Sequence, residues 1–411
     1  MAVEERKKLD EYLDNHKEWK AFKEEKRRCN YLFDYVSRII DSDSSCRIYR
    51  YATPEDLPIY LFEHYERLAL SEIPSVDEIL FYVFETGVAF LELKISYGDM
   101  PVNEIINFAY YFKSSNRAEK TKYGKREGQK SLYEVTGDIL PEEESGTKHF
   151  FVNRSRLKYQ LMCFHMVKAD YGNEFERNQL LFRLKRSYTE SFVYEEGNDF
   201  GHYDMTYAPY EYMAFGGCQE GFAAVCHDTG IAGTDYFINE IFYNQLVSDY
   251  HYLYLVLLNQ RFSEMKYIEE IACSEDTKEL VEQISKKIIH LKTRYSFHVV
   301  SDDYIYQNIY SKMYEILDID KLFLDIEENG DRLALVQNND SVETEKENNR
   351  FLMCISLLAV FSALVDLASY LDRMSFATLV STVVSAVGVL AVIGYSAFNI
   401  VRKRTKKNKK K

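Results

Sequence analysis

The sequence has few residues that interrupt helices and strands, and its cysteines are not spaced for cross-links. Among its 411 residues are only 6 Pro, 17 Gly and 1 Trp, against 34 Tyr and 26 Phe. This balance excludes a collagen-like or low-complexity chain. The 7 Cys are odd in number and form no Cys-x-x-Cys pair. Neither a disulfide framework nor a zinc ribbon is therefore indicated, and a reducing compartment is expected.

Several motifs of enzymatic chemistry are also missing from the sequence. It has no Gly-x-x-x-x-Gly-Lys-Ser/Thr loop, no His-Glu-x-x-His, no Gly-x-Ser-x-Gly and no dinucleotide fingerprint. The 9 His are scattered without metal-ligand spacing. The sequence therefore predicts that the chain is not an enzyme.

Charge is divided sharply along the chain. Residues 351–411 hold 9 of the 51 Lys+Arg and 2 of the 65 Asp+Glu, which leaves residues 1–350 with 42 bases, 63 acids and a net charge of −21. Nucleic-acid phosphates are bound by clustered Lys and Arg. We therefore expect no direct nucleic-acid partner, although a local anion pocket stays open.

The pattern over residues 1–230 predicts an α+β domain, a possible ligand sensor. Residues 1–41 favour a charged amphipathic helix, and β-rich runs at 79–84 and 88–96 flank Glu85-Thr86-Gly87 as a hairpin. A helix is expected at 102–113, after Pro101, and a polar surface insertion at 114–146. A second hairpin is expected at 212–226, with Gly216, Gly217 and Gly221 around its turn.

Long helices are predicted after this domain because residues 234–329 contain neither Gly nor Pro. We expect a long-helix region at 231–317, broken near 273–277 and again near 301–303, where Ser and Asp can cap helices. A stalk helix is expected at 318–350.

Two long apolar runs, 351–371 and 376–401, follow the stalk. The first contains one charge, Asp366, and the second contains none. A membrane-spanning helix needs about 20 apolar residues, so both runs predict spans, joined as a hairpin by four residues. The tail, 402–411, carries eight bases, which by the positive-inside rule places both termini in the cytoplasm and the chain in the inner membrane. The start of the sequence has no apolar signal-peptide region.

A stripe of small or polar residues follows one face of the first predicted span. At 100° per residue, Asn349, Leu352, Ser356, Ala359, Ala363, Asp366 and Tyr370 fall within an arc of about 100°. The stripe suits a packing seam between helices, or a pore lining in a ring of subunits. We favour the pore, because an Asp buried away from water costs at least about 2.5 kcal/mol. Asp366 and Asp372 are then the candidate metal-binding residues.

Candidate ligand-binding residues are basic side chains in the α+β domain. They are Arg154 and Arg156 in HFFVNRSRLKY, and Arg183, Lys185 and Arg186 in LLFRLKRSY. Guanidinium groups match the geometry of phosphate. Asp228 in CHDTG can accept from an adenine amine or a ribose hydroxyl. The alternatives are a solvated charged face for each basic cluster and a turn cap for Asp228.

The architecture resembles the CorA family of cation channels, which also combine a cytoplasmic α+β domain, a stalk and two C-terminal spans. The segments NQLVSDYHYLYLVLLNQRFSEMKYIEEIA, SDDYIYQNIYSKMYEIL and ENNRFLMCISLLAVFSALVDLASYL resemble the divergent CorA-like proteins associated with type III CRISPR systems. The ETGVAFLELKISYGD hairpin adds to the resemblance. One departure is that the stretch after the first span is SYLDRMSF, without the Gly-Met-Asn of ordinary CorA channels.

The resemblance implies a ring-shaped homo-oligomer in the lipid bilayer, a pentamer in that branch. It further implies an antiviral channel opened by a small nucleotide second messenger such as an S-adenosylmethionine-AMP adduct. The missing Gly-Met-Asn puts magnesium selectivity in doubt, and Mg²⁺ stays open as a transported or regulatory ion. Two alternatives remain: a transporter of magnesium or another divalent cation, and a membrane-anchored enzyme.

Overall fold

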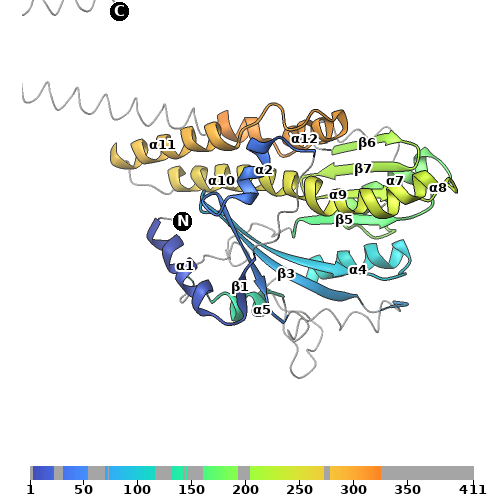
Figure 1. Cartoon of the computed structure of the whole chain (residues 1–411), viewed down its shortest axis with the longest axis horizontal. Helices are drawn as coiled ribbons and strands as arrows, with labels where there is room; N and C mark the ends of the chain where they lie inside the picture. Colours follow the sequence, from blue (N-terminus) through green and yellow to red (C-terminus); the bar gives the residue numbers. More distant parts are fainter. Residues whose placement is uncertain are drawn as a thin grey trace, which may run out of the picture. The chain divides into compact units, whose positions relative to one another are not determined.

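The structure is a computed structural model that describes residues 3–22, 31–53, 70–72, 74–115, 132–141, 145, 161–192, 204–272 and 278–324. The chain divides into two compact units, Met1–Leu333 and Ala334–Lys411. All described residues belong to the first unit, which is a mixed α+β fold with two four-stranded sheets (Figure 1).

The first sheet is antiparallel and has the order β1-β2-β3-β4. Its strands are β1 (Trp19–Ala21), β2 (Cys46–Tyr51), β3 (Ser75–Phe84) and β4 (Ala89–Ser96). The predicted hairpin at 79–96 is confirmed as the β3–β4 pair. Its turn contains Gly87 with a φ of 83°, a left-handed conformation that glycine adopts without strain.

Alternate residues of β3 pack on opposite faces of this sheet. Leu80, Tyr82 and Phe84 contact α10 (His251–Ala272) and α11 (Lys278–Tyr295). Ile79 and Phe81 face the opposite core, which includes α1 (Val3–Asn15), α4 (Val102–Ser115) and α5 (Leu132–Ile139). The period-2 alternation of a strand therefore places the first sheet between two helical layers.

The β3–β4 turn is held by side chains from α10 and α11. Thr86 donates to Asn259 Oδ1 at 2.6 Å. Tyr295 donates to Glu85 Oε1 at 2.8 Å, and Arg294 Nε lies 2.9 Å from the same oxygen. These contacts join residues about 170 to 210 positions apart, so the turn is a tertiary anchor between the sheet and the helices.

The second sheet has the order β5-β8-β7-β6 and combines β5 (Cys163–Lys168), β6 (Asp204–Tyr210), β7 (Met213–Cys218) and β8 (Gly221–Cys226). The predicted hairpin at 212–226 is confirmed as β7–β8. Gly216 and Gly217, however, lie inside β7 and not at the turn. At Gly216 a Cβ would lie 3.2 Å from Leu181 Cβ, so the glycine permits close helix packing.

Helices cover both faces of the second sheet. On one face, α7 (Glu174–Arg186) and Ile106 of α4 pack on Ala214, Ala223 and Val225. On the other face, α10 and α12 (Tyr304–Ile316) pack on residues that include Phe215 and Phe222. The strands β7 and β8 are buried along their whole length because both faces are covered.

The prediction of one helix over residues 1–41 is wrong. The described residues form α1, then β1, then α2 (Asp34–Asp41). The strand forms because Trp19 is buried against Tyr51 and Phe81 and donates to the carbonyl of Ile139. The predicted polar insertion at 114–146 likewise contains α5, whose Val135 and Ile139 are buried.

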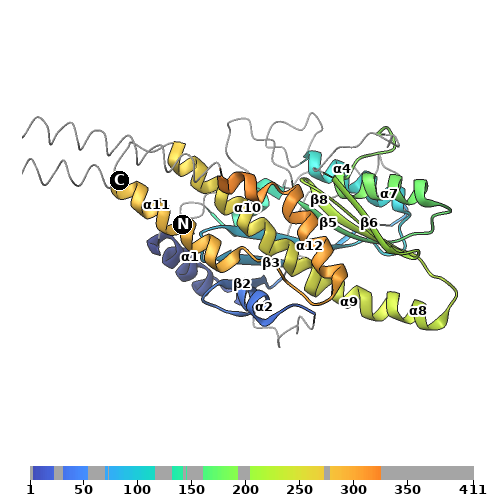
Figure 2. The same cartoon turned by 90° about the horizontal axis from the view of Figure 1, so that it is seen from above.

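The predicted long helices are confirmed at α10 and α11. In Figure 2, α8 (Ala232–Tyr236), α9 (Tyr243–Gln245) and α10 follow one line, joined by the π-helical segments η4 (Phe237–Phe242) and η5 (Leu246–Tyr250). The predicted break near 301–303 is confirmed, because Asp303 caps α12 by accepting from Ile305 N at 2.8 Å. The predicted break at 273–277 lies outside the described residues.

The predicted fold class, a CorA-like chain ending in a transmembrane hairpin, is contradicted by the described part of the chain. Within it, no helix is both long enough and apolar enough to cross a membrane. The physical reason is clear in α10, which has 22 residues but carries Asn259, Gln260, Arg261 and Glu264 in its middle. The predicted spans 351–371 and 376–401, the tail 402–411 and the stalk beyond residue 324 lie outside the described residues.

Candidate functional site

The last turn of α7 carries three of the predicted ligand-binding residues. The helix begins after Asn173, whose side chain accepts from Glu176 N at 3.0 Å, and ends at Ser187, whose φ of 53° is left-handed. Arg183, Lys185 and Arg186 are 8%, 2% and 9% exposed. Cations are favourable at a helix C-terminus because the helix dipole is negative there.

A single carboxylate on β6 faces two of these cations. Asp204 Oδ1 forms an ion pair with Lys185 Nζ, and Asp204 Oδ2 lies 2.6 Å from Arg186 Nη2. Lys185 also donates to the carbonyl of Met205 at 3.0 Å. Burial lowers the pKa of Lys185, whereas the charge of Asp204 and its hydrogen bond raise it. The buried ammonium thus depends on this one carboxylate for its neutralisation.

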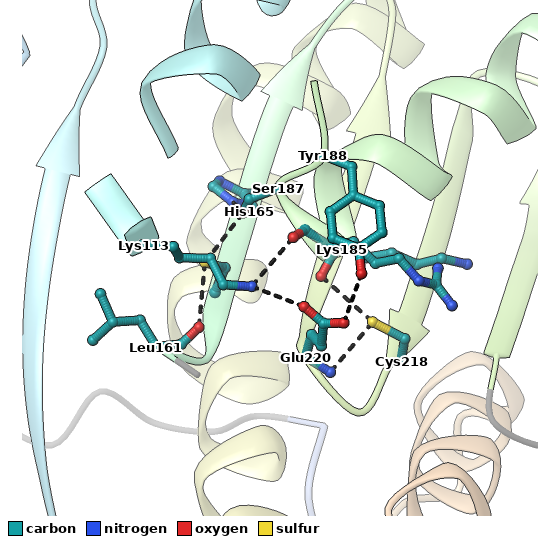
Figure 3. Close-up of polar contacts among 10 residues, drawn as sticks. Lys113, Leu161, His165, Lys185, Ser187, Tyr188, Cys218 and Glu220 are labelled. Carbon is teal, nitrogen blue, oxygen red and sulfur yellow. Dashed lines mark hydrogen bonds and ion pairs between the residues drawn. The ribbon is translucent and has the colours of Figure 1, made fainter. Parts of the chain in front are cut away.

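A second ion pair closes the end of the same helix. Lys113 of α4 lies 3.2 Å from Glu220 Oε2 and donates to the carbonyl of Arg186 at 3.2 Å (Figure 3). Tyr188 donates to Glu220 Oε1 at 3.1 Å. Burial, followed by the nearby Glu220, raises the pKa of Tyr188 to about 12, so its hydroxyl keeps its proton at neutral pH and donates a hydrogen bond.

Arg183 is held differently from the other two bases. Its Nη1 donates to Asn103 Oδ1 at 2.9 Å, and its Nε donates to the carbonyl of Tyr188 at 3.4 Å. Its Nη2 is buried and has no hydrogen-bond partner among the described residues. Burial lowers the pKa of Arg183, and the charge of the exposed Glu190 opposes this. The guanidinium therefore keeps one buried donor that no described residue satisfies.

The charges of this group do not cancel. We define the α7 cluster as Lys113, Arg183, Lys185, Arg186, Asp204 and Glu220. Counted over the described residues alone, this group contains four cations and two carboxylates, which leaves an excess of two positive charges, or one when the exposed Glu190 is included. In an otherwise acidic domain, this excess can attract an anion.

Aromatic rings lie beside the α7 cluster. The rings of Tyr188 and Phe192 are 4.6 Å apart, and the rings of Tyr110 and Phe192 are 6.2 Å apart. Phe192 is 41% exposed. Arg186 lies over the ring of Phe182 at 4.6 Å from its centroid. The combination offers cations for an anionic group and ring faces for an aromatic group.

Behind the cluster, Ser187 lies between a histidine and a cysteine. Ser187 Oγ donates to Cys163 Sγ at 3.3 Å and lies 3.4 Å from His165 Nε2 (Figure 3). Burial, followed by the charge of Lys113, lowers the pKa of His165 to about 4, so the ring is neutral at pH 7. Ser187 is only 1% exposed and His165 only 6%. We interpret this set as core packing that supports the end of α7.

A glycine brings the strands close to this helix end. At Gly221, which pairs with Cys163 on one side and Cys218 on the other, a Cβ would lie 2.6 Å from the carbonyl oxygen of Lys185. The same Cβ would lie 2.7 Å from the carbonyl oxygen of Cys163. Neither backbone atom can move aside easily, so glycine at this position fixes where α7 ends against the sheet.

The structure unites only part of the predicted ligand site. Arg183, Lys185 and Arg186 lie together, but Asp228 follows the opposite end of β8, a strand of six residues that spans about 17 Å. Asp228 pairs with Lys168 at 2.6 Å, and this hydrogen bond lowers its pKa. Arg154 and Arg156 lie outside the described residues.

The predicted turn cap at Asp228 is replaced by another aspartate. Asp235 Oδ1 accepts from Thr229 N at 2.7 Å and from Thr229 Oγ1 at 3.0 Å. Asp228 instead accepts from Asn239 Nδ2 at 3.4 Å in addition to its contact with Lys168. It is therefore a surface ion-pair residue of the second sheet.

The predicted pore and metal residues all lie outside the described residues. They are Asn349, Leu352, Ser356, Ala359, Ala363, Asp366, Tyr370 and Asp372. Within the described ranges, no group of three or more His, Cys, Asp or Glu side chains is placed to hold a metal ion. A regulatory or transported Mg²⁺ thus stays an untested prediction.

Sequence reasoning missed the partners of the α7 cluster. Lys113 and Glu220 are 107 positions apart, and Arg183 and Asn103 are 80 positions apart. No local pattern links such residues. The sequence contains a local signal only. Three bases lie in the last turn of a helix whose end is otherwise apolar, where the helix dipole favours cations.

Comparisons of this chain with protein-family models, with curated proteins and with solved structures find no match. The CorA-like identity therefore rests on the resemblance alone. That resemblance also implies a membrane location, a channel and a role beside CRISPR systems. None of these finds support in the described part of the chain, in which no helix can cross a membrane.

Proposed function

We propose that the described α+β fold is a sensor domain that binds a small anionic ligand of nucleotide type at the α7 cluster. Two observations on the described residues carry the proposal: cations outnumber carboxylates at the end of α7, and one Arg183 donor has no hydrogen-bond partner there. The predicted channel is not included, because its fold class is contradicted within the described residues.

The chemistry of the proposed ligand follows from the two kinds of side chain in the site. A phosphate oxygen would accept from Arg183 Nη2, which is buried in the structure and would have to become accessible on binding. An aromatic base would stack on the exposed ring of Phe192, next to Tyr188. Arg side chains bind phosphate through paired N–H donors, and ring stacking tolerates different bases. A nucleotide contains both required groups.

Isothermal titration calorimetry on the full chain tests the proposal. The titrants are inorganic phosphate, AMP, ATP and the S-adenosylmethionine-AMP adduct. We expect at least one nucleotide to bind more tightly than phosphate, and Arg183→Gln to weaken that binding at least tenfold, since a charged hydrogen bond contributes about 1.5–3 kcal/mol. Phe192→Ala should weaken the nucleotide and leave phosphate unchanged.

Arg177→Gln provides the matched control, because Arg177 lies on the same helix and pairs with Glu174 at 3.0 Å, away from the cluster. Its affinity should equal that of the wild type. Equal affinities for Arg183→Gln and Arg177→Gln would contradict the proposal, as would an absence of heat with every titrant.

A further inference from the structure

A buried carboxyl group that is not part of the α7 cluster lies in the middle of α10. Glu264 is 3% exposed, and its Oε2 has no hydrogen-bond partner among the described residues. Burial, followed by the charge of Asp320, raises the pKa of Glu264 to about 9. At neutral pH this carboxyl group therefore carries a proton.

One turn before Glu264, a side chain of α10 contacts the backbone at the C-terminal end of α12. Arg261 donates to the carbonyl of Leu317 at 3.0 Å. Asp318 then takes a left-handed φ of 55°, and a new helical segment starts at Ile319, with Leu322 N donating to Asp318 O at 3.0 Å. We call Leu317–Asp318 the α12 junction.

The apolar side chain of Leu317 is buried in the core, and the polar groups of the α12 junction are bonded by a small set of side chains among the described residues. Besides Arg261, Gln219 donates to the carbonyl of Ile316 at 3.2 Å and to Asp318 Oδ2 at 2.9 Å. Lys321 lies 2.7 Å from the other oxygen of Asp318. A left-handed non-glycine residue of this kind persists only where its surroundings impose it. The junction is thus a bend whose geometry depends on its contacts with α10 and the β7–β8 turn.

We propose that proton loss from Glu264 releases the α12 junction from α10, which makes the junction a latch that opens as the pH rises. A carboxylate at this position would be buried without a hydrogen-bond donor among the described residues, one turn from Arg261. Its charge would draw Arg261 away from the Leu317 carbonyl, or draw water in beside it. Either change opens the junction.

The charged groups around Glu264 set the direction of the response. On α10, Arg261 favours the ionised form, and beyond the junction Asp320 opposes it. Tyr314 of α12 faces Asp320 and donates to its Oδ1 at 2.9 Å. From α11, Arg294 and Tyr295 face Glu85 instead. Burial is the largest effect, so the closed junction keeps the protonated carboxyl group.

The sign of the pH dependence follows from linkage. An opened junction exposes Glu264 to water, where its pKa returns to the ordinary glutamate value of 4.5. The closed form is therefore favoured fully below about pH 4.5, and its advantage declines up to about pH 9. In this window the ratio of closed to open junction should fall by at most about tenfold for each unit of pH, because one proton is involved.

Hydrogen–deuterium exchange of peptides that cover residues 317–324 measures this ratio in the full chain. Wild type and Glu264→Gln are compared at the same pH, from 5 to 9, so that the intrinsic exchange rates cancel. We expect the Gln variant, an isostere of the protonated carboxyl group, to stay protected while the wild type loses protection steadily. Parallel curves for the two proteins would overturn the proposal.

Two further variants keep the test decisive. Glu315→Gln removes an exposed carboxylate on α12 and should leave the wild-type curve unchanged. Asp320→Asn removes a charge that raises the pKa of Glu264 in the closed form, so its loss of protection should end at a lower pH than in the wild type, even if Glu264→Gln does not fold. A loss of protection that ends at the same pH as in the wild type would count against the proposal. The ligand titrations above use other residues, so the two proposals can fail separately.

Discussion

Replacing Asp204 by Asn tests whether the α7 cluster is held by charge. The substitution keeps the shape of the side chain but removes the carboxylate that faces Lys185 and Arg186. Both bases then remain inside the protein with less neutralisation, the Lys185 side chain being 3% exposed. Breaking a buried pair by removing one partner typically costs about 3–5 kcal/mol.

The structure contains a matched comparison on the same sheet. Lys168 and Asp228 form a close pair at 2.6 Å, yet their side chains are 46% and 49% exposed. Exposed ion pairs contribute about 0–1 kcal/mol, because water and salt screen them. Asp228→Asn should therefore cost less than about 1 kcal/mol, so burial alone predicts a difference of several kcal/mol between two Asp→Asn changes.

Urea unfolding followed by circular dichroism measures both variants against the wild type. Adding Lys185→Met to Asp204→Asn should recover part of the lost stability, because the uncompensated ammonium is then removed. Equal losses for Asp204→Asn and Asp228→Asn would refute the argument from burial. The same conclusion would follow if Lys185→Met made the Asp204→Asn variant less stable still.

Three other outcomes follow from the packing and the charges. Gly221→Ala should lower the free energy of unfolding by about 1–3 kcal/mol or more, because its Cβ would meet the carbonyl oxygens of Lys185 and Cys163. Gly137→Ala, in a helix with nothing within 4 Å of the new Cβ, should instead stabilise by up to about 1 kcal/mol in the same urea assay. The lowered pKa of His165 means that the unfolded chain binds its proton first, so stability should fall as the pH drops from about 6.5 to about 4, by about 3 kcal/mol at the limit. Urea titrations at several pH values should show this slope in the wild type and lose it in His165→Gln.

The elements that could be predicted from the sequence have local causes. The β3–β4 hairpin follows from alternating apolar residues around Glu85-Thr86-Gly87, and α12 from the capping Asp303. β1 could not be predicted, because its three residues become a strand only when Trp19 packs against Tyr51 and reaches Ile139. Tertiary contacts there override a helical pattern.

The sequence predicts the part of the candidate site that lies on one helix, α7, but not the partners that other elements contribute. Three bases at the end of α7 were visible in LLFRLKRSY, but the side chains that neutralise and orient them come from β6, α4 and the β7–β8 turn. The chemistry of Asp228 suits a nucleotide and predicts a place in the same site, whereas the length of β8 separates Asp228 from the three bases. Residue type indicates possible chemistry, but the strand order decides which residues meet.

The anchoring of the β3–β4 turn has a consequence for synthesis on the ribosome. Glu85 emerges 210 residues before Tyr295, the side chain that holds it. At about 5–20 residues per second, translation needs roughly 10–40 s to produce that partner. Until α10 and α11 have been synthesised, these helices cannot cover the hairpin face that carries Leu80, Tyr82 and Phe84. Nascent chains stalled before residue 250 should consequently recruit chaperones to this strand.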